Sequence, residues 1–234
     1  MDMSDSNYDG DSNEEKEEIT RSLASVPKAV VARLSLYLRE LQILLRQGCE
    51  TVSSIQLGKV LGFTDAQVRK DLAFFGQFGY PGIGYRCAEL VNEIKKIMGT
   101  DRQWSVALIG CGNLGRALLG YRGFHQKGFK IVAAFDIDPA KTESDFEGIP
   151  VFDIDEMPKL AIEHQIRLAI LAVPANAANE VAEKVSSAGI QGILNFAPVT
   201  LNPIDGVSAV GVDLAIELEQ LCYSVVKKKD DENQ

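Results

Sequence analysis

Apolar side chains recur at helical spacing near the N-terminus. The spacing predicts a helix over Pro27–Gln47, built on the apolar positions Val30, Leu34, Leu38, Leu41 and Leu45. Pro27 suits the first turn, where its missing N–H has no partner to lose. Gly48 suits the position after the last turn, because glycine tolerates the left-handed backbone that ends many helices.

Two shorter helices and a glycine-rich hairpin follow. The polar pairs at 53–54 and 64–65 can cap helices that end at Leu61 and Phe75. Two short helices joined by a tight turn are typical of a helix-turn-helix. Residues 76–85 contain four glycines, a proline and three aromatic residues, a composition that indicates a hairpin or wing rather than a linker.

After residue 99 the pattern changes. A last helix of the N-terminal part is predicted at Ala88–Met98, and short apolar runs then alternate with helices. The predicted strands are Trp104–Ile109, Lys130–Phe135, Arg167–Val173 and Gly192–Phe196, and the predicted helices are Leu114–Leu119, Val181–Ala188 and Asp213–Val226. Strands that alternate with helices imply a parallel sheet built from β-α-β units.

The predicted fold class is therefore α/β, with an N-terminal winged helix-turn-helix domain followed by a parallel, doubly wound Rossmann domain and a C-terminal helix. We expect a disordered acidic tail at 1–18, the winged-helix domain at 19–99, the Rossmann domain at 100–211, the final helix at 212–228 and a second tail at 229–234. The first tail is too charged and polar to bury a core.

A dinucleotide motif follows the first Rossmann strand. Gly110-Cys111-Gly112-Asn113-Leu114-Gly115 fits G-x-G-x-x-G and opens a predicted helix. Asp136 lies 21 residues after Gly115, at the end of the next strand, where an acid can accept hydrogen bonds from the adenosine ribose. Asp138 is a second, weaker candidate for that role. An acid there repels a 2′-phosphate, which favours NAD⁺ and NADH over their phosphorylated forms.

The charge distribution points to a polyanionic partner. The net charge is −9, but residues 1–18 carry eight acids and one base, and residues 101–234 carry nineteen acids and twelve bases. Residues 19–100 carry eleven bases and only six acids. A basic segment between two acidic ones suits a nucleic-acid interface.

The third helix carries the side chains expected to read DNA. Gln67, Arg69 and Lys70 can reach base edges or phosphates in a major groove, while Val68 and Leu72 have the spacing of a core face. Three further residues are expected at the double-stranded DNA: Ser53, Ser54 and Tyr85.

Composition argues against other classes of protein. The cysteines are widely spaced, with no CxxC pair, which argues against structural zinc and disulfides and favours a cytoplasmic protein. The longest apolar stretch is interrupted by Pro174 and Asn176 and is too short to span a membrane. His125 and His164 lie in polar surroundings, and no catalytic group stands out beside the cofactor motif. The sequence thus predicts a cofactor site without an enzyme activity and without a metal.

Several segments, taken together, resemble the Rex family of redox-sensing transcriptional repressors. The similar segments are Val68–Gly79, Gly82–Tyr85, Gly110–Leu118, Phe135–Pro139, Val173-Pro174 and Gly192–Val199. They occur in order and at matching spacing across residues 25–226, so no single motif carries the resemblance.

The resemblance implies a homodimer that binds operator DNA when NADH is scarce and releases it when NADH rises. It also implies that the final helix swaps onto the partner and serves in dimerisation. Tyr121 matches a tyrosine near the nicotinamide, and Asp213 and Arg39 match an acid and an arginine that meet this tyrosine in a switch. Two groups of neighbours complete the expected cofactor pocket: Val173 and Pro174, and Phe196, Ala197 and Pro198.

One stretch departs from the family pattern. Many members carry an arginine in the wing, where Tyr80-Pro81 stands in this chain. A wing arginine suits a narrow minor groove, so we expect the wing of this chain to contact DNA differently, with Arg86 as the substitute. Two alternatives stay open: an NAD-dependent oxidoreductase with a helical appendage, and a cofactor-binding scaffold whose basic domain binds a protein.

Overall fold

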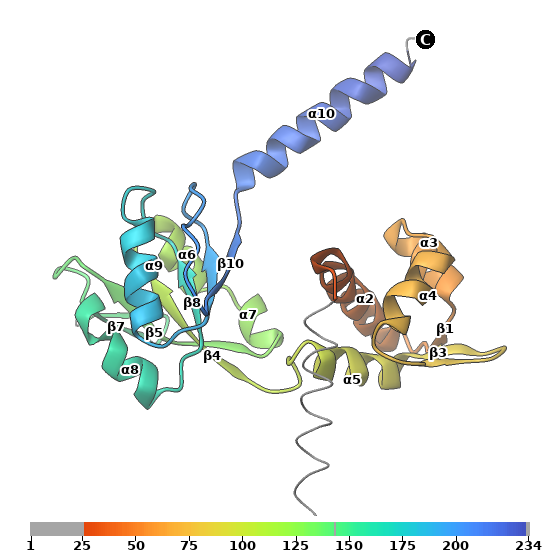
Figure 1. The fold of residues 1–234 in the computed structure, drawn as a ribbon, viewed down its shortest axis with the longest axis horizontal. Coiled ribbons are helices and arrows are strands. Elements are labelled where there is room, and N and C mark those ends of the chain that lie inside the picture. The colour runs from red at the N-terminus through yellow and green to blue at the C-terminus, as the bar shows by residue number, and fades with distance from the viewer. Residues whose placement is uncertain (1–25, 143, 233–234) are drawn as a thin grey trace, which may run out of the picture. The chain divides into compact units, whose positions relative to one another are not determined.

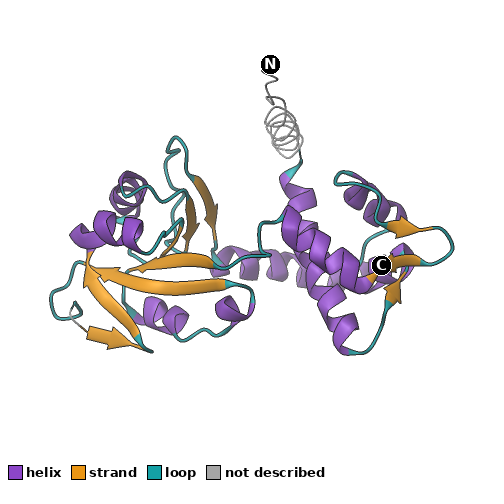
Figure 2. Ribbon diagram, turned by 90° about the horizontal axis from the view of Figure 1, so that it is seen from below, coloured by secondary structure: helices purple, strands orange, loops and turns teal. Residues whose placement is uncertain are grey.

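The computed structural model describes residues 26–142 and 144–232. The chain forms two compact units, Met1–Asp101 and Arg102–Gln234, each with its own sheet and helices (Figures 1 and 2). The acidic tail predicted at 1–18 lies outside the described residues, as do residues 233–234.

The N-terminal unit is a winged helix-turn-helix, as predicted. Its elements are α2 (Lys28–Arg46), β1 (Thr51–Val52), α3 (Ser54–Leu61), α4 (Asp65–Ala73), β2 (Gly79–Tyr80), β3 (Gly84–Arg86) and α5 (Cys87–Ile97). The three short strands pair antiparallel in the order β1-β3-β2, and β2 and β3 form the wing. The core contains the apolar side of α2, including Leu34 and Leu41, packed against Leu57, Val68 and Ile94.

The polar caps of the helix-turn-helix act as the sequence predicts. Ser53 caps α3 through a reciprocal pair of hydrogen bonds with Gln56, and Thr64 caps α4 by accepting from the amide of Gln67. Gly62 adopts the left-handed conformation between them. These caps fix where α4 begins and therefore which of its side chains face outward.

The C-terminal unit is a seven-stranded sheet between two layers of helices. Its elements begin with β4 (Trp104–Ile109), α6 (Asn113–Leu119), α7 (Gly123–Gln126), β5 (Phe129–Asp136), β6 (Ser144–Phe146) and β7 (Ile149–Asp153). They continue with a 3-10 turn (Ile154–Glu156), α8 (Met157–Glu163), β8 (Leu168–Leu171), α9 (Ala178–Ser187), β9 (Gly192–Asn195), β10 (Ser208–Gly211) and α10 (Leu214–Glu232).

The strand order β10-β9-β8-β4-β5-β7-β6 is parallel throughout, except that β6 pairs antiparallel with β7 at one edge. Helices α8 and α9 cover one face of the sheet through residues such as Met157, Leu160 and Val185. Leu119 of α6 packs on the other face with Val106 and Leu108. The doubly wound Rossmann arrangement is thus confirmed.

Some elements differ from the prediction. Strands β1, β6, β7 and β10 and helices α7 and α8 were not predicted. Helix α10 runs to Glu232, so residues 229–232, predicted as tail, are helical, because the charged residues after Val226 contain no glycine or proline that would end the helix. Among the helices of the described residues, none has the length and apolar composition needed to cross a membrane.

Candidate nucleotide and DNA sites

The glycine motif lies at the topological switch point of the Rossmann sheet, where the strand order reverses. Strand β4 lies between β5 and β8. On the β5 side the sheet continues with β7 and β6, and on the β8 side it continues with β9 and β10, so the strand order reverses at β4. The loop after β4 therefore sits at the crevice where open α/β sheets bind ligands. Gly112 caps α6, which places the helix N-terminus and its free N–H groups at this crevice.

Each glycine of the motif meets a different constraint. Gly110 has φ +96°, and a Cβ there would lie 2.6 Å from the carbonyl oxygen of Ala172. A Cβ on Gly115 would lie 1.9 Å from the carbonyl oxygen of Gly110. A Cβ on Gly112 would have no atom within 4 Å. Protein packing therefore requires the first and third glycines, while the space beside the second is open to a ligand.

Asp136 is a buried carboxylate aimed at the same loop. Its Oδ2 accepts from the amide of Cys111 at 2.7 Å and from Lys141 Nζ at 3.1 Å, and its Oδ1 accepts from the amide of Asp138 at 3.0 Å. Burial alone would raise its pKa, but the hydrogen bonds from Asp138, Cys111 and Lys141 outweigh burial and lower the pKa. The carboxylate is therefore ionised at neutral pH.

Lys141 is a site residue that the sequence analysis missed. It also lies 3.6 Å from the carboxylate of Asp138 and so neutralises part of this acidic pair. The neighbouring thiol of Cys111 points into the core, where burial and then Asp136 raise its pKa to about 11. Cys111 thus contributes a backbone amide, not a reactive thiol.

A cavity of about 380 Å³ brings together residues after three strands. It is lined by Gly110 and Gly112 after β4, by Asp136, Asp138 and Lys141 at the end of β5, and by Val173 and Pro174 after β8. Asn113, Leu114 and Gly115 continue into α6 and do not line it. Apart from Lys141, the lining residues named here were assigned to the dinucleotide by the sequence analysis, whereas Cys111, also assigned, does not line the cavity.

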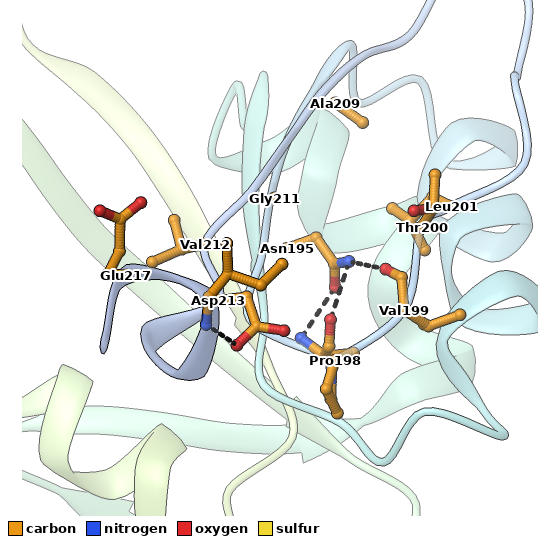
Figure 3. A pocket seen from close by; sticks show the side chains of 12 residues that line it. Asn195, Pro198, Val199, Thr200, Leu201, Ala209, Gly211, Val212, Asp213 and Glu217 are labelled. Atoms are coloured by element: carbon orange, nitrogen blue, oxygen red, sulfur yellow. Dashed lines mark hydrogen bonds between the residues drawn. The ribbon is translucent and has the colours of Figure 1, made fainter. Parts of the chain in front are cut away.

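A second cavity, of about 480 Å³, lies at the ends of β9 and β10. Ala197, Pro198, Asp213 and Glu217 are among its lining residues (Figure 3). The Asn195 side chain accepts from the amide of Ala197 and donates to the carbonyls of Ala197 and Val199, which holds this loop in place. The residues expected to form the cofactor pocket are therefore divided between two cavities.

Phe196 requires a correction. It was expected to line the nicotinamide pocket, but it lines neither cavity and packs beside Leu194 on the opposite face of the sheet. Successive side chains of a strand point to opposite faces, and the alternation along β9 sends Ile193 to one face and Leu194 and Phe196 to the other.

The helix predicted to read DNA presents a mixed set of side chains. Lys70 is exposed. Arg69 donates to Ser54 Oγ at 3.1 Å and pairs with Asp65 at 2.7 Å, so it joins the two helices of the motif at their exposed surface. Gln67 is half-buried, and its Nε2 donates to Asp71 Oδ1 at 2.6 Å. Ser53 is occupied in capping α3.

Tyr85 was predicted at the DNA, and this prediction is wrong. The side chain is only 7% exposed and belongs to the core of the N-terminal unit. It faces inward because successive residues of β3 point to opposite faces of the small sheet, and burial raises the pKa of its hydroxyl. Its role is to support the wing.

The wing carries a compact polar cluster. The Arg86 guanidinium lies 4.6 Å from the ring centre of Tyr80, and both side chains hydrogen-bond to Glu89, at 2.8 and 3.0 Å. Arg86, the proposed substitute for a wing arginine, is therefore exposed but already paired with an acid.

A buried carboxylate on the inner side of α4 was also missed. Asp71 is 0% exposed and accepts from Arg33, Tyr37 and Gln67. One signal was available in the sequence: Asp71 falls three residues after Val68 on the core face, and Arg33 and Tyr37 stand one turn apart on α2.

The proposed switch residues belong to both units. Arg39 is exposed on α2 of the N-terminal unit. In the other unit, Asp213 caps α10 by accepting from the amide of Ala215 at 2.9 Å, and Tyr121 is 58% exposed and packs edge-on against Phe124. Tyr121 does not line the cavity that contains Asp213. Their joint action stays a prediction.

A broad apolar surface is exposed on the C-terminal unit. Helix α10 leaves the sheet after β10 (Figure 1) with many large apolar side chains exposed: Leu214, Ile216, Leu218, Leu221, Tyr223, Val225 and Val226. An apolar cavity of about 350 Å³ opens on the sheet, lined by Phe124, Phe129, Ile131, Leu194 and Val210 among others. Exposed apolar surface of this extent marks an interface.

Geometry and topology together define a class of protein: a winged-helix unit joined to a Rossmann unit with an open dinucleotide crevice. Two family models match the chain, the putative DNA-binding protein N-terminus at residues 25–73 and the CoA binding domain at residues 101–199. Within the described residues, no cluster of three or more His, Cys, Asp or Glu side chains is arranged to hold a metal ion.

The chain belongs to the Rex family of redox-sensing transcriptional repressors. It is 45% identical over 204 residues to the redox-sensing transcriptional repressor Rex of Pelotomaculum thermopropionicum. The aligned residues cover 87% of this chain and 96% of the relative. The Rex protein of Carboxydothermus hydrogenoformans is 44% identical over 200 residues, or 86% and 96% of the two chains. These relatives are named as repressors, so the oxidoreductase alternative is set aside.

Solved structures agree. The Rex-family repressor RSP in complex with β-NAD⁺ and operator DNA matches with a TM-score of 0.82 and 34% identity, covering 89% of this chain and 96% of that one. RSP in complex with β-NADH matches with a TM-score of 0.81 and 32% identity, covering 89% and 98%. The predicted family and fold class are confirmed.

Proposed function

We propose that this chain is a redox-sensing repressor that binds double-stranded operator DNA when NADH is scarce and releases it when NADH binds. One observation carries the proposal: a chain of the Rex family combines a helix that exposes Arg69 and Lys70 in a winged unit with an open glycine loop above a buried acid. A repressor of this kind acts where its operator lies, in the bacterial cytoplasm.

The residues of the crevice fit a dinucleotide. The open space beside Gly112 lets a pyrophosphate approach the backbone amides at the start of α6. Asp136 accepts from a ribose hydroxyl, Asp138 adds negative charge, and Val173 and Pro174 provide apolar walls. Tyr121, Ala197 and Pro198 are assigned to the nicotinamide end.

NAD⁺ and NADH differ in charge at the nicotinamide, which is cationic when oxidised and neutral when reduced. Apolar walls at Val173, Pro174 and Pro198 favour the neutral form, because desolvating a charge costs free energy. Affinity alone switches nothing: NADH must bind the DNA-incompetent arrangement more tightly. A change from 1:99 to 99:1 needs a differential affinity of about 5.5 kcal/mol.

On the DNA side, Gln67, Arg69, Lys70 and Ser54 are assigned to the major groove. The release signal is assigned to Arg39, Tyr121 and Asp213, acting on the arrangement of the two DNA-binding units in a homodimer. The working domain boundaries are 19–99 and 100–211, after the acidic tail proposed at 1–18, and the dimerisation segment starts at 212 and continues to the end of α10 at Glu232.

We assign the exposed apolar side of α10 to the homodimer interface, in which the helix swaps onto the partner subunit. Leu218 and Leu221 lie on one side of α10 and are exposed. Replacing both with Asp is expected to give a monomer, while Glu219→Asp, a change on the same helix that keeps its charge, leaves the dimer intact. Light scattering on a sizing column measures the mass, and a dimeric double variant refutes the assignment.

The function is tested by selecting bound DNA from a random pool and then titrating NADH. We expect salt-dependent, sequence-specific binding that NADH reverses, with NAD⁺ as a competitor. CoA serves as a control nucleotide, because one family model bears its name, and it is expected to have no effect. DNA binding that ignores saturating NADH would refute the sensor function.

A further inference from the structure

The helix assigned to the major groove, α4, carries a buried carboxylate on its inner side. Asp71 accepts from Arg33 Nε at 2.5 Å and Nη2 at 2.8 Å and from the Tyr37 hydroxyl at 2.7 Å. All three bonds come from α2. The fourth comes from Gln67 Nε2 at 2.6 Å, one turn earlier on α4 itself. Asp71 is completely buried, so its partners are fixed by the fold.

The bond to Asp71 determines which way the Gln67 amide faces. The amide nitrogen must face the carboxylate, because a flipped amide would place Oε1, an acceptor, against another acceptor. Among the described residues, no donor is hydrogen-bonded to Oε1, which leaves this oxygen and the second Nε2 hydrogen available. Gln67 is thus held in one of its two amide orientations before any DNA arrives.

The α2 side chains keep Asp71 in its accepting form. Burial favours protonation, but hydrogen bonds from Arg33, Tyr37 and Gln67 outweigh burial and lower the pKa of Asp71. Burial and Asp71 together raise the pKa of Tyr37, so its hydroxyl stays a donor. At neutral pH the group is a stable anion that receives four donated hydrogens.

We propose that Asp71 is a positioning residue that makes Gln67 a reader of adenine. Adenine presents an N6 donor and an N7 acceptor in the major groove, and a glutamine amide pairs with both. A Gln67 held by Asp71 offers Oε1 to N6 and its free Nε2 hydrogen to N7. Guanine presents two acceptors, one of which would face Oε1. This inference rests on the proposed function, because it requires α4 to enter the major groove.

The experiment measures base preference rather than affinity alone. DNA selected by the full-length protein is resynthesised with each base at each position, and binding is measured for the wild type, Gln67→Ala and Asp71→Asn. Gln47→Ala is the matched control, since Gln47 is an exposed glutamine at the end of α2. A good bidentate pair discriminates by roughly tenfold to a hundredfold.

We expect the wild type and Gln47→Ala to prefer adenine over guanine at one position by at least about tenfold. Gln67→Ala and Asp71→Asn lose this preference at the same position and keep the others, and the double variant loses no more than either one. A Gln67→Ala variant with the wild-type profile overturns the proposal, and so does an Asp71→Asn variant that keeps the adenine preference.

A second measurement holds even if Asp71→Asn fails to fold. The side-chain amide signal of Gln67 in the NMR spectrum is identified by its absence in Gln67→Ala. In the free wild-type protein, the hydrogens of this amide should exchange with solvent at least tenfold more slowly than those of the Gln47 side chain. Equal exchange rates overturn the proposal. If the wild type selects no sequence, the proposed function and this inference fall together. Specific, NADH-sensitive binding with an unchanged Gln67→Ala profile overturns the inference alone.

Discussion

The glycine loop separates the requirements of folding from those of ligand binding. At Gly112 the backbone angles, φ −76° and ψ −165°, are open to any residue, and an added Cβ meets nothing within 4 Å. Gly112→Ala stabilises the protein by about 0.4–1 kcal/mol, because alanine reduces the conformational entropy of the unfolded chain. It destabilises the protein by a similar amount, because alanine is a poorer helix N-cap than glycine. We expect the free energy of unfolding to change by less than about 0.5 kcal/mol.

Dinucleotide binding should respond very differently. The new methyl group occupies the space through which a pyrophosphate reaches the backbone amides. Losing one charge-assisted hydrogen bond costs about 1.5–3 kcal/mol, which corresponds to a roughly 10- to 100-fold weaker affinity for NADH. NADH fluorescence titration measures the affinity, and thermal unfolding measures the stability of the same samples.

Gly115→Ala is the contrasting variant. Its Cβ would lie 1.9 Å from a backbone oxygen, and backbone cannot turn aside as a side chain can, so we expect a loss of at least about 3 kcal/mol of stability. The reasoning is refuted if Gly112→Ala binds NADH within twofold of the wild type, or if Gly115→Ala unfolds at the wild-type temperature.

Three further predictions concern charge. Lys70→Ala should weaken binding to all DNA sequences and reduce the slope of log K against log salt by about 1, as measured by titration at several salt concentrations; an unchanged slope removes Lys70 from the phosphates. Because the pKa of Asp71 is lower in the folded protein than in the unfolded chain, its contribution to stability is complete above pH ~4 and is lost as the pH falls further. The urea midpoints of unfolding at pH 7 and pH 3 should therefore differ less for Asp71→Asn than for the wild type. Lys141→Ala removes a cation 3.1 Å from Asp136 and should increase the preference for NADH over NADPH, which competitive titration measures; a reduced preference would contradict this reading.

The sequence was sufficient wherever a local rule determined the structure. Strand β4 has the predicted bounds, Trp104–Ile109, because a short, mostly apolar run followed directly by a glycine-rich turn favours a buried strand over a helix. The glycine loop and Asp136 were located from spacing alone, since the motif is short and each of its glycines answers one steric demand. Local capping rules likewise predicted that α4 begins at Thr64 or Asp65, and the structure makes Thr64 the cap.

The roles of residues that act through distant partners were missed, even where, as for Asp71, the spacing from Val68 gave one signal. Asp71 reads as one more polar residue of a solvent-facing helix until α2 brings Arg33 and Tyr37 against it, 38 and 34 residues away. Strand β10, with the weak sequence Ser-Ala-Val-Gly, exists only because it pairs with β9. Tyr85 and Phe196 were assigned to ligands by likeness, and the pleat of their strands turned both rings elsewhere.

The partners of Asp136 limit how a ribose can bind. An ionised carboxylate offers about four acceptor positions, and three are occupied: two on Oδ2, by Cys111 and Lys141, and one on Oδ1, by Asp138. One ribose hydroxyl can therefore bind Oδ1 without displacing anything. A second hydroxyl must take the place of the Lys141 ammonium, the partner on the most flexible stem. Binding through both hydroxyls thus implies that Lys141 moves, so this lysine, which no motif marked, belongs to the nucleotide site as much as the acid does.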